Sequence, residues 1–411
     1  MNSFSSNMKT VIVGAGAAGC FCAIELKRRR PDVDVVVLEA GAKPLAKVAL
    51  TGGGRCNLTN TFRKVERLED VYPRGFRLMR RAFGRFSPED TVRWWEDEGV
   101  RLVAQEDECI FPESQDAMQI VRTLTRLMQD CGVEVQCGCK VDRIERGDGG
   151  FTLTLDDGSA LCCDAVVVTT GGCKGSALRN LLPREVEVND TLPSLFTLKI
   201  ADEALCALMG TVVENVSLRL SGTRFASEGT LLITDWGISG PVTLKLSSYA
   251  AIHLAQTQYK GSLIVNWLNR PEEEIQDWID HTINNCARKA LVNIHPEELS
   301  SRLWQHILRH CGLREDMRWA EIGGKGISRL VNELSCACYP ICGRARFKDE
   351  FVTCGGVSLG TVDSTTLQSR KVPGLFFAGE VLDVDAVTGG FNLQAAWSTA
   401  MMVAEAMAQD S

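Results

Sequence analysis

The feature that most constrains this chain is a glycine-rich turn near its beginning, the sequence GAGAAG at residues 14–19. Residues 10–13 before the turn are mostly β-branched and apolar, and they predict a buried strand. A helix is expected from residue 17 to about residue 30, where Pro31 ends it, and a second strand is expected at residues 33–38. This is the order of a βαβ unit, so we expect an α/β fold with a Rossmann-type dinucleotide-binding domain.

Each glycine of the turn has a physical task in binding a dinucleotide. Gly14 permits the tight turn, Gly16 lets the backbone approach a pyrophosphate, and Gly19 lets the helix pack closely on the strand. The unpaired N–H groups at the start of the helix favour a phosphate. Glu39 ends the second strand, about 20 residues beyond the turn, where an acid accepts hydrogen bonds from an adenosine ribose. The turn alone does not distinguish NAD from FAD.

Two further segments indicate FAD rather than NAD. Residues 51–57, TGGGRCN, closely follow the second strand and Lys47, and their exposed amides and arginine suit a ligand edge that is rich in carbonyl groups. Three short strands are expected farther on, at residues 141–146, 151–155 and 161–169. They form a β-meander that ends in Thr-Gly-Gly at residues 170–172, which is typical of flavoproteins of the two-dinucleotide-binding type.

A third segment that indicates FAD lies near the C-terminus. Residues 374–378 predict a strand, and Gly379 and Glu380 follow it, where an acid can bind the ribityl hydroxyls of FAD. TGGFN at residues 388–392 leads into a helix expected at residues 393–407, whose N-terminus would stabilise negative charge on the reduced flavin. The sequence has no second G-x-G-x-x-G turn, so a nicotinamide cofactor would bind only transiently.

The residues expected to contact FAD gather in these segments. They are Gly14, Gly16, Ala17, Ala18, Gly19, Glu39, Ala40, Lys47, Thr51, Gly53, Gly54, Arg55, Cys56, Asn57, Val141, Thr170, Gly171, Gly172, Gly379, Glu380, Asp383, Gly390, Asn392, Leu393 and Ala395. Arg55 and Cys56 are also the candidate catalytic residues, because an arginine beside a thiol in a glycine loop can lower the thiol pKa. In an alternative interpretation, Cys56 only packs beneath the cofactor.

A few other side chains are weaker candidates for handling a proton or a substrate. Tyr339 and Asp383 are possible proton carriers. Asp235 and Ser239 could meet the substrate, although the glycines and proline around them also fit a simple turn. All five histidines fall at residues 253–310, and we expect them to have structural roles.

Composition excludes several classes of function. The net charge of −7 gives no reason to expect a nucleic-acid partner, and no apolar run reaches the roughly 18 residues of a membrane span. The polar start of the chain, residues 1–9, does not fit a signal peptide, so we expect a cytoplasmic protein with reduced cysteines. Cys336, Cys338 and Cys342 lack the spacing of a zinc or iron–sulfur site, so no metal is expected. We expect a small-molecule substrate and a monomer or homodimer.

Five longer motifs resemble one family, the HI0933-like flavoproteins, also called the BaiN or aminoacetone-oxidase group. The motifs are VIVGAGAAG from Val11, LTGGGRCNLTN from Leu50, ITDWGISGP from Ile233, VTCGGVSLGTVD from Val352 and GLFFAGEVLDVDAVTGGFNLQAAW from Gly374. They occur in the order of the family, and the resemblance covers nearly the whole chain. One departure is Asp385-Ala386, where the family usually has Asp-Gly. We expect this alanine to tighten the loop over the flavin without abolishing binding.

The resemblance implies three domains. The FAD-binding domain is expected to be discontinuous, at residues 1–190 and 350–411. An inserted β-rich domain is expected at residues 191–255 and 334–349, and a helical domain nested within it at residues 256–333. The nested segment is rich in helix-forming residues, in agreement with this expectation.

The resemblance leads to three hypotheses about function. The first is an FAD-dependent oxidoreductase in which NAD(P)H drives reduction of a conjugated carbon–carbon double bond, in an unsaturated 3-oxo steroid of the bile-acid type or another small hydrophobic substrate. The second is an FAD-dependent oxidase of small amines such as aminoacetone, which would produce hydrogen peroxide. The third is a flavin-containing RNA-modification or RNA-binding factor, which the acidic overall charge disfavours.

Overall fold

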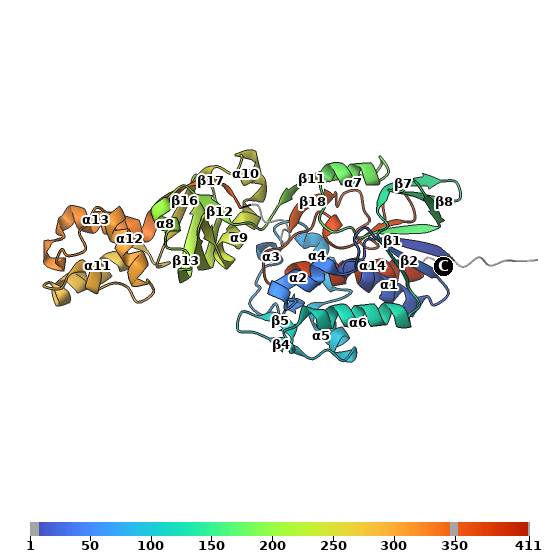
Figure 1. The fold of residues 1–411 in the computed structure, drawn as a ribbon, viewed down its shortest axis with the longest axis horizontal. Coiled ribbons are helices and arrows are strands. Elements are labelled where there is room, and N and C mark those ends of the chain that lie inside the picture. Colours follow the sequence, from blue (N-terminus) through green and yellow to red (C-terminus); the bar gives the residue numbers. More distant parts are fainter. Residues whose placement is uncertain (1–7, 346–351, 410–411) are drawn as a thin grey trace, which may run out of the picture. The chain divides into compact units, whose positions relative to one another are not determined.

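The chain gathers into two compact units in the computed structural model, which describes residues 8–345 and 352–409 (Figure 1). The first unit comprises Met1–Pro193 and Lys348–Ser411, and the second comprises Ser194–Phe347. The predicted domain limits at residues 349 and 350 lie outside the described residues. Each unit has its own sheet system, and each is described below by itself.

The first unit is built on a five-stranded parallel sheet with the strand order β19-β10-β1-β2-β6. The strands are β1 (Lys9–Val13), β2 (Asp34–Glu39), β6 (Glu134–Cys137), β10 (Ala165–Val168) and β19 (Leu375–Phe377). The three strands in the middle of this order are almost continuous runs of buried valine, isoleucine and leucine, as expected of a sheet covered on both faces. The predicted Rossmann-type fold is therefore confirmed.

Two helices far apart in the sequence pack together in the first unit. They are α1 (Ala17–Arg29) and α14 (Phe391–Gln409), the first and last helices of the described part of the chain (Figure 1). The rings of Phe21 and Trp397 meet between them, with 5.6 Å between their centroids. Trp397 is fully buried, and its Nε1–H donates a hydrogen bond of 3.0 Å to the Leu58 carbonyl.

Smaller elements complete the first unit. The helices are α2 (Ala46–Gly54), α3 (Leu68–Val71), α4 (Phe76–Phe83), α5 (Pro88–Asp97), α6 (Ala117–Asp130), α7 (Gly175–Leu181) and the 3₁₀ turn η3 (Gly379–Val381). The strands are β3 (Thr59–Asn60), β4 (Leu102–Ala104), β5 (Cys109–Pro112), β7 (Val141–Gly147), β8 (Gly150–Leu155), β9 (Ala160–Cys163), β11 (Val188–Pro193) and β18 (Thr353–Val357).

One predicted strand, residues 161–169, is wrong as a single element. Its first part is β9, which pairs antiparallel with β8, and its second part is β10, which pairs parallel with β1. The break falls at Asp164, whose backbone N–H donates to the Lys9 carbonyl at 2.9 Å. The chain changes sheets here because the two halves have different partner strands, which the apolar pattern does not reveal.

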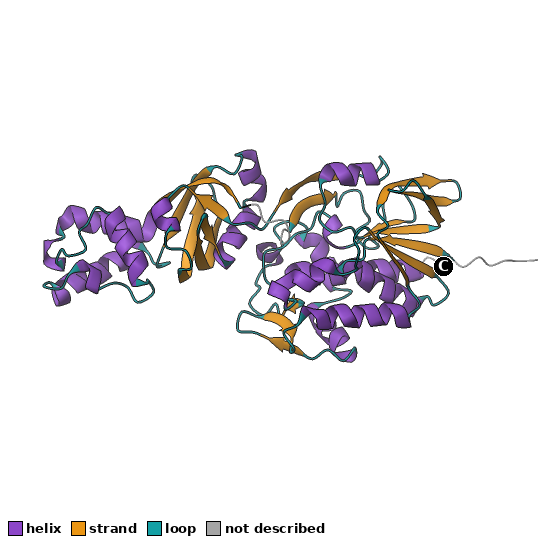
Figure 2. Cartoon of the chain, in the orientation of Figure 1, coloured by secondary structure: helices purple, strands orange, loops and turns teal. Residues whose placement is uncertain are grey.

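The second unit contains a closed six-stranded barrel with the order β12-β15-β14-β13-β16-β17. Its strands are β12 (Leu198–Ile200), β13 (Val212–Leu220), β14 (Ala226–Thr234), β15 (Gly237–Ser239), β16 (Gly261–Asn266) and β17 (Ala337–Arg344). Three short helices accompany the barrel strands in sequence, α8 (Glu203–Cys206), α9 (Pro241–Tyr249) and α10 (Ala251–Gln256). The remaining helices are α11 (Glu272–Cys286), α12 (Ser301–His310), α13 (Gly323–Cys336) and the 3₁₀ turns η1 (Leu291–Asn293) and η2 (Trp319–Glu321), which cluster at one end of the unit (Figure 2).

Two predicted domain limits differ from the structure. The limit at residue 256 is wrong, because β16 lies beyond it and pairs with both β13 and β17 to close the barrel. The limit at residue 190 cuts through β11, which continues to Pro193 and pairs with β18 in the first unit. Both errors arise because strand pairing joins segments that are distant in the sequence. Within residues 8–345 and 352–409, no helix combines the length and apolar character that crossing a membrane requires.

The packing of α1 on α14 should dominate the stability of the first unit. We expect Trp397→Ala to lower the free energy of unfolding by about 3–5 kcal/mol, because it leaves a large cavity and an unpaired Leu58 carbonyl. Urea unfolding followed by circular dichroism measures this change. The half-exposed Val103 of the same unit provides the control, since Val103→Ala should cost less than about 0.5 kcal/mol. Equal effects of the two substitutions would contradict this assignment of the core.

Candidate cofactor-binding and active site

The glycine turn lies where β1 ends and α1 begins, and its three glycines have different surroundings. Gly14 has a φ of +108°, and a Cβ there would lie 2.6 Å from the Thr169 carbonyl oxygen. A Cβ on Gly19 would lie 2.0 Å from the Gly14 oxygen. In contrast, a Cβ on Gly16 would meet nothing within 4 Å. Gly14 and Gly19 are therefore required by the packing of the protein, whereas Gly16 faces open space.

The N-terminus of α1 is available to an anion. No side chain caps it, and its first turn carries no acidic residue. Since the first N–H groups of a helix have no partner within the helix, they present partial positive charge in front of the turn. Ala17 and Ala18, the first two residues of α1, keep this end free of large side chains. This is the arrangement that binds a pyrophosphate in dinucleotide folds.

Glu39 is held rigidly beside the same turn. Its Oε2 accepts a hydrogen bond of 2.9 Å from the N–H of Ala15, and its Oε1 accepts one of 2.7 Å from the N–H of Gly41. The Glu39 carbonyl in turn accepts from the N–H of Cys139 at 2.9 Å, which brings the start of β7, at Val141, toward this end of the sheet. Ala40 lies in the exposed turn after Glu39. These contacts support the predicted adenosine end of the site.

A second cluster forms around Glu380. Its carboxylate is 3.0 Å from the Lys47 ammonium, and it accepts a hydrogen bond of 3.0 Å from the N–H of Thr353. Gly172 lies so close that a Cβ there would be 2.5 Å from Glu380 Oε1. Gly171, which follows the half-buried Thr170, has a φ of +69°. Three segments predicted to bind the cofactor, around residues 47, 172 and 380, are therefore brought together.

The TGGGRCN loop forms the end of α2 and leaves the helical conformation at Thr51. Gly53 and Gly54 have φ angles of +67° and +82°, and a Cβ on either would meet nothing within 4 Å. The amide of Asn57, oriented to satisfy both of its ends, donates to the Thr59 carbonyl at 2.9 Å and accepts from the N–H of Gly390 at 3.2 Å. The loop is thus fastened to the start of α14 while its glycines stay accessible.

The loop before α14 is held by contacts that sequence reasoning missed. Buried Asp385 forms an ion pair with Arg74, which lies 311 positions away in the sequence. The Asn392 side chain accepts from the N–H of Ala386 at 2.9 Å and donates to the Ala386 carbonyl at 3.0 Å. Ala386 is fully buried and is not among the residues with positive φ, so alanine fits where the family usually has glycine.

Four other predicted cofactor residues also lie in this part of the first unit. Gly379 has a φ of +76°, and a Cβ there would be 2.8 Å from the Cβ of Ala18. Leu393 is half-buried and Ala395 is buried, both in the first turns of α14. Asp383 accepts hydrogen bonds from the Asn189 amide at 2.7 Å and from the N–H of Gly355 at 3.1 Å. Its carboxylate therefore joins the β11–β18 pair to the loop after η3.

The two candidate catalytic residues have opposite environments. Arg55 is exposed, and its guanidinium stacks over the Phe111 ring at 4.4 Å. Cys56 is fully buried, and burial raises the pKa of its thiol to about 12. The predicted lowering of the Cys56 pKa is therefore wrong, because loss of solvation outweighs the hydrogen bond with Thr51 that lowers the pKa. The alternative interpretation, in which Cys56 packs within the protein, agrees with this burial.

Three of the weaker candidates, Asp235, Ser239 and Tyr339, lie in the second unit, whereas Asp383 lies in the first. Asp235 and Ser239 belong to the β14–β15 hairpin, and the Ser239 hydroxyl accepts from Thr197 at 2.8 Å. Tyr339 is buried in β17, its hydroxyl donates to Glu333 at 3.3 Å, and burial raises its pKa far above the usual range. Among the described residues there is no group of three or more metal-ligating side chains that could hold an ion.

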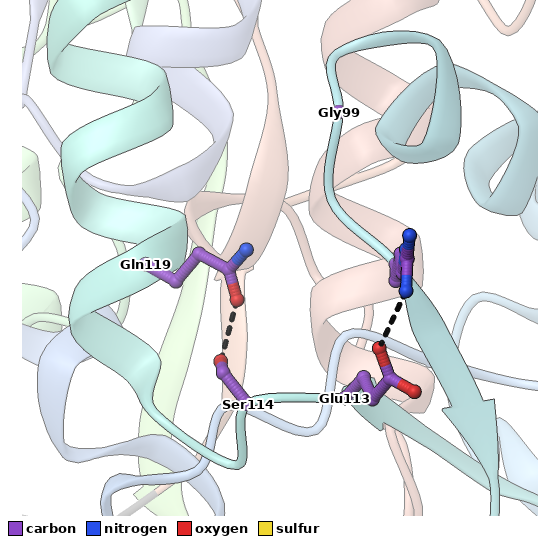
Figure 3. A pocket seen from close by; sticks show the side chains of 5 residues that line it. Gly99, Glu113, Ser114 and Gln119 are labelled. Atoms are coloured by element: carbon purple, nitrogen blue, oxygen red, sulfur yellow. Dashed lines mark hydrogen bonds and ion pairs between the residues drawn. The ribbon is translucent and has the colours of Figure 1, made fainter.

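The first unit also has surface cavities outside the predicted cofactor residues. One of about 370 Å³ is lined by Gly99, Arg101, Glu113, Ser114 and Gln119 (Figure 3). Arg101 and Glu113 form an ion pair of 3.8 Å across it, and the Ser114 hydroxyl donates to the Gln119 side chain. Its polar groups are thus already paired with one another.

The residues of the glycine turn, of the cluster around Glu380 and of the TGGGRCN loop fit FAD. Gly16, Gly53 and Gly54 leave open backbone where a cofactor must approach closely, and the α1 N-terminus and Glu39 offer the groups that bind pyrophosphate and ribose. The fold and this arrangement define a Rossmann-type flavoprotein.

Comparison with known proteins identifies the family. The model described as HI0933-like protein Rossmann domain matches residues 8–406, and the chain belongs to this family of FAD-binding oxidoreductases. The ribosomal RNA dihydrouridine synthase of Escherichia coli is 30% identical over 413 residues, which cover 96% of each chain. The 3-dehydro-bile acid delta(4,6)-reductase of Clostridium scindens is 27% identical over 415 residues, 97% of this chain and 98% of its own. A mutant E. coli quinol fumarate reductase FrdA shares the fold, with a TM-score of 0.50, 14% identity, and coverage of 98% of this chain and 70% of that one.

The open space at Gly16 allows the cofactor contact to be tested without disturbing the fold. We expect Gly16→Val to fold normally and to lose at least about nine-tenths of its FAD, because the new side chain occupies the place of the pyrophosphate. Flavin absorbance per protein, with circular dichroism of the same sample, measures both effects. Gly149→Val is the matched control, since Gly149 also faces open space but lies far from the turn in the β7–β8 hairpin. Full FAD content in Gly16→Val would contradict the placement of the pyrophosphate.

The raised pKa of Cys56 predicts a thiol that is neutral and inert at working pH. We expect Cys56→Ala to leave the pH dependence of turnover unchanged between about pH 6 and 9. Burial raises the pKa of the Cys56 thiol to about 12 in the folded protein, above its ordinary value of 9.0. The stabilisation linked to the protonated thiol is therefore fully present below pH 9 and is lost as pH rises toward 12. Unfolding measured over that range should therefore depend less steeply on pH in Cys56→Ala. A change in the pH dependence of turnover in Cys56→Ala would instead support a catalytic role for the thiol.

Proposed function

We propose that the protein is an FAD-dependent reductase of a carbon–carbon double bond conjugated with a carbonyl group, and that NADH or NADPH supplies the electrons. The observation that carries this proposal is the similarity, along 96–97% of the chain, to two relatives whose names imply that reaction. Dihydrouridine is uridine with its 5,6 double bond reduced, and that bond is conjugated with a ring carbonyl. The bile-acid reductase acts, by its name, on double bonds of a 3-dehydro steroid.

The chemistry sets clear demands on the protein. Reduction adds a hydride to the carbon remote from the carbonyl and a proton to the carbon beside it, while negative charge develops on the carbonyl oxygen. Bound FAD supplies the hydride chemistry, and the protein binds the cofactor, orients the substrate and stabilises the developing charge. The α1 N-terminus, Glu39 and the Glu380 cluster would hold the cofactor in place.

Arg55 is the residue that best fits the charge-stabilising role. Among the described residues it has no carboxylate within ion-pair distance, and the Phe111 ring and the Gln115 side chain hold its guanidinium, the latter at 3.4 Å. It follows the accessible Gly53 and Gly54 directly in the loop. We therefore propose that Arg55 donates a hydrogen bond to the substrate carbonyl and favours the enolate-like charge as it forms.

Two substrate classes fit this reaction. One is an unsaturated 3-oxo steroid or another small hydrophobic enone. The other is a uracil ring in RNA, which is favoured because the rRNA dihydrouridine synthases of E. coli and Haemophilus influenzae are 30% and 29% identical to this chain. NAD(P)H would bind transiently in either case, since the sequence has only one G-x-G-x-x-G turn. Oxidation of small amines is the alternative to both.

Anaerobic reduction of the FAD-loaded protein tests the reductase proposal first. We expect NADH or NADPH to bleach the flavin spectrum, and a uracil-containing RNA or a steroid enone to restore it, with two hydrogens gained by the product in mass spectrometry. We expect Arg55→Gln to lower kcat/KM by about 100-fold at unchanged FAD content, as for loss of one donor to a developing oxyanion. Arg101→Gln, a change at an exposed arginine of the same unit, should have little effect.

The outcomes separate the alternatives. A flavin that neither nucleotide reduces, together with hydrogen peroxide formed from small amines in air, would replace the reductase with an amine oxidase. Normal turnover in Arg55→Gln would contradict the role of that arginine while leaving the reaction class intact.

A further inference from the structure

The charge of the first unit is unevenly distributed, although the whole chain is acidic. Residues 63–85 hold eight basic and three acidic residues, a local net charge of +5 in a chain of net charge −7. The basic residues are Arg63, Lys64, Arg67, Arg74, Arg77, Arg80, Arg81 and Arg85. The expectation of no nucleic-acid partner rested on the total charge, which hides this local excess.

Three of these arginines are free to bind an anion. Arg77, Arg80 and Arg85 are exposed, and among the described residues none of them has a carboxylate within ion-pair distance. Arg77 and Arg80 lie three positions apart on α4, so their side chains project from neighbouring turns of one helix. Guanidinium groups placed in this way bind successive phosphates of a nucleic-acid backbone through bidentate hydrogen bonds.

The guanidinium groups of two of these arginines lie over the same aromatic ring. The Phe76 ring is half-buried, and the guanidinium carbons of Arg77 and Arg80 lie 5.7 Å and 5.9 Å from its centroid. Arginine planes and aromatic rings are the surfaces on which unpaired bases stack. The group formed by Phe76, Arg77 and Arg80 thus offers both stacking and phosphate contacts.

A cavity adjoins the same helix. It has a volume of about 360 Å³ and is lined by Arg77, Leu78 and Arg81 of α4 and by Leu359, Gly360, Val362 and Ser364. Arg81 donates a hydrogen bond of 2.6 Å to the Ser364 hydroxyl, which fixes its guanidinium at the cavity wall. Apolar walls with two cations suit a planar base that carries a phosphate, and the volume lies at the lower end of the range for small-ligand sites.

The start of α4 is tied directly to the cofactor segment. Arg74 pairs with buried Asp385, and a Cβ on Gly75 would lie 2.5 Å from the Val384 side chain. Tyr72, just before them, donates a hydrogen bond of 2.7 Å to the Phe391 carbonyl at the start of α14. A ligand bound on α4 would therefore lie beside the loop that leads to the predicted flavin site. Both α4 and this loop belong to the first unit.

We propose that Phe76, Arg77, Arg80, Arg81 and the adjoining cavity form a docking surface for a single-stranded RNA segment, which flanks the uracil that is reduced. This inference rests on the proposed function with RNA as the substrate. RNA is favoured over an anionic membrane because none of the large exposed hydrophobic side chains of the described chain lies on α4. Stacking and paired guanidinium contacts suit unpaired nucleotides, which are the usual form in which RNA sequence is recognised.

Binding of a fluorescent oligouridine RNA to the FAD-loaded protein tests the surface. We expect Arg77→Glu/Arg80→Glu to raise Kd at least about tenfold at about 100 mM salt. The plot of the logarithm of the association constant against the logarithm of the salt concentration should become less steep by about 1.4, since each single-strand phosphate contact contributes about 0.7 to its steepness. The matched control is Lys140→Glu/Arg143→Glu, which makes the same charge change at the same spacing on the exposed β7 side of the unit. The control should keep wild-type affinity to within about twofold.

The readouts distinguish failure of this surface from failure of the proposed function. Reduction of the flavin by NAD(P)H, measured in the same samples, should be unchanged in both double variants. Failure of the wild-type protein to bind the RNA, equal loss of affinity in both double variants, or binding to anionic lipid vesicles in place of RNA would each overturn the docking surface. Any of these results leaves reduction of a small enone possible, and only a flavin that NAD(P)H cannot reduce contradicts the reductase itself.

Discussion

The structure of the first unit depends on the close approach of three backbone segments at the end of β1. A Cβ on Gly19 would lie 2.0 Å from the Gly14 oxygen, and one on Gly14 would lie 2.6 Å from the Thr169 oxygen. Only glycine permits this contact, which sets α1 directly against β1 and β10. Because α1 is placed in this way, its N-terminus and the open backbone of Gly16 face the space that a pyrophosphate requires. The same contact therefore determines both the packing of α1 and the position of the predicted pyrophosphate site.

Features that depend on local sequence could be predicted, and features that depend on distant partners could not. The βαβ unit and Glu39 follow from a periodicity of a few residues and a glycine spacing. The break at Asp164 follows from two different partner strands, and β16 belongs to the barrel through its pairing with strands before and after it. The Arg74–Asp385 ion pair joins residues 311 positions apart, so no local sequence pattern predicts it.

Burial determines the pKa of the Cys56 thiol, and this burial cannot be predicted from the residues next to Cys56 in the sequence. Arg55 and Cys56 are adjacent in the chain, yet the guanidinium is exposed and the thiol is fully buried. A positive φ of 61° at Cys56 turns the chain so that consecutive side chains have these different environments. The loss of water around the thiol outweighs its hydrogen bond with Thr51, and the pKa of Cys56 rises instead of falling. The available charge of this loop is therefore that of Arg55.

Reaction and substrate are set by different parts of such a protein. Relatives at 27–30% identity span nearly all of this chain, although their names give substrates as different as ribosomal RNA and a bile acid. The features that fit a cofactor in this chain, the open glycine backbone and the N-terminus of α1, belong to the fold itself. The polarity and charge of the surface beside the cofactor site decide which molecule reaches it. In this chain the docking surface that we propose includes α4, where the local charge is opposite in sign to that of the whole protein, so total charge alone is a poor basis for excluding a polyanionic substrate.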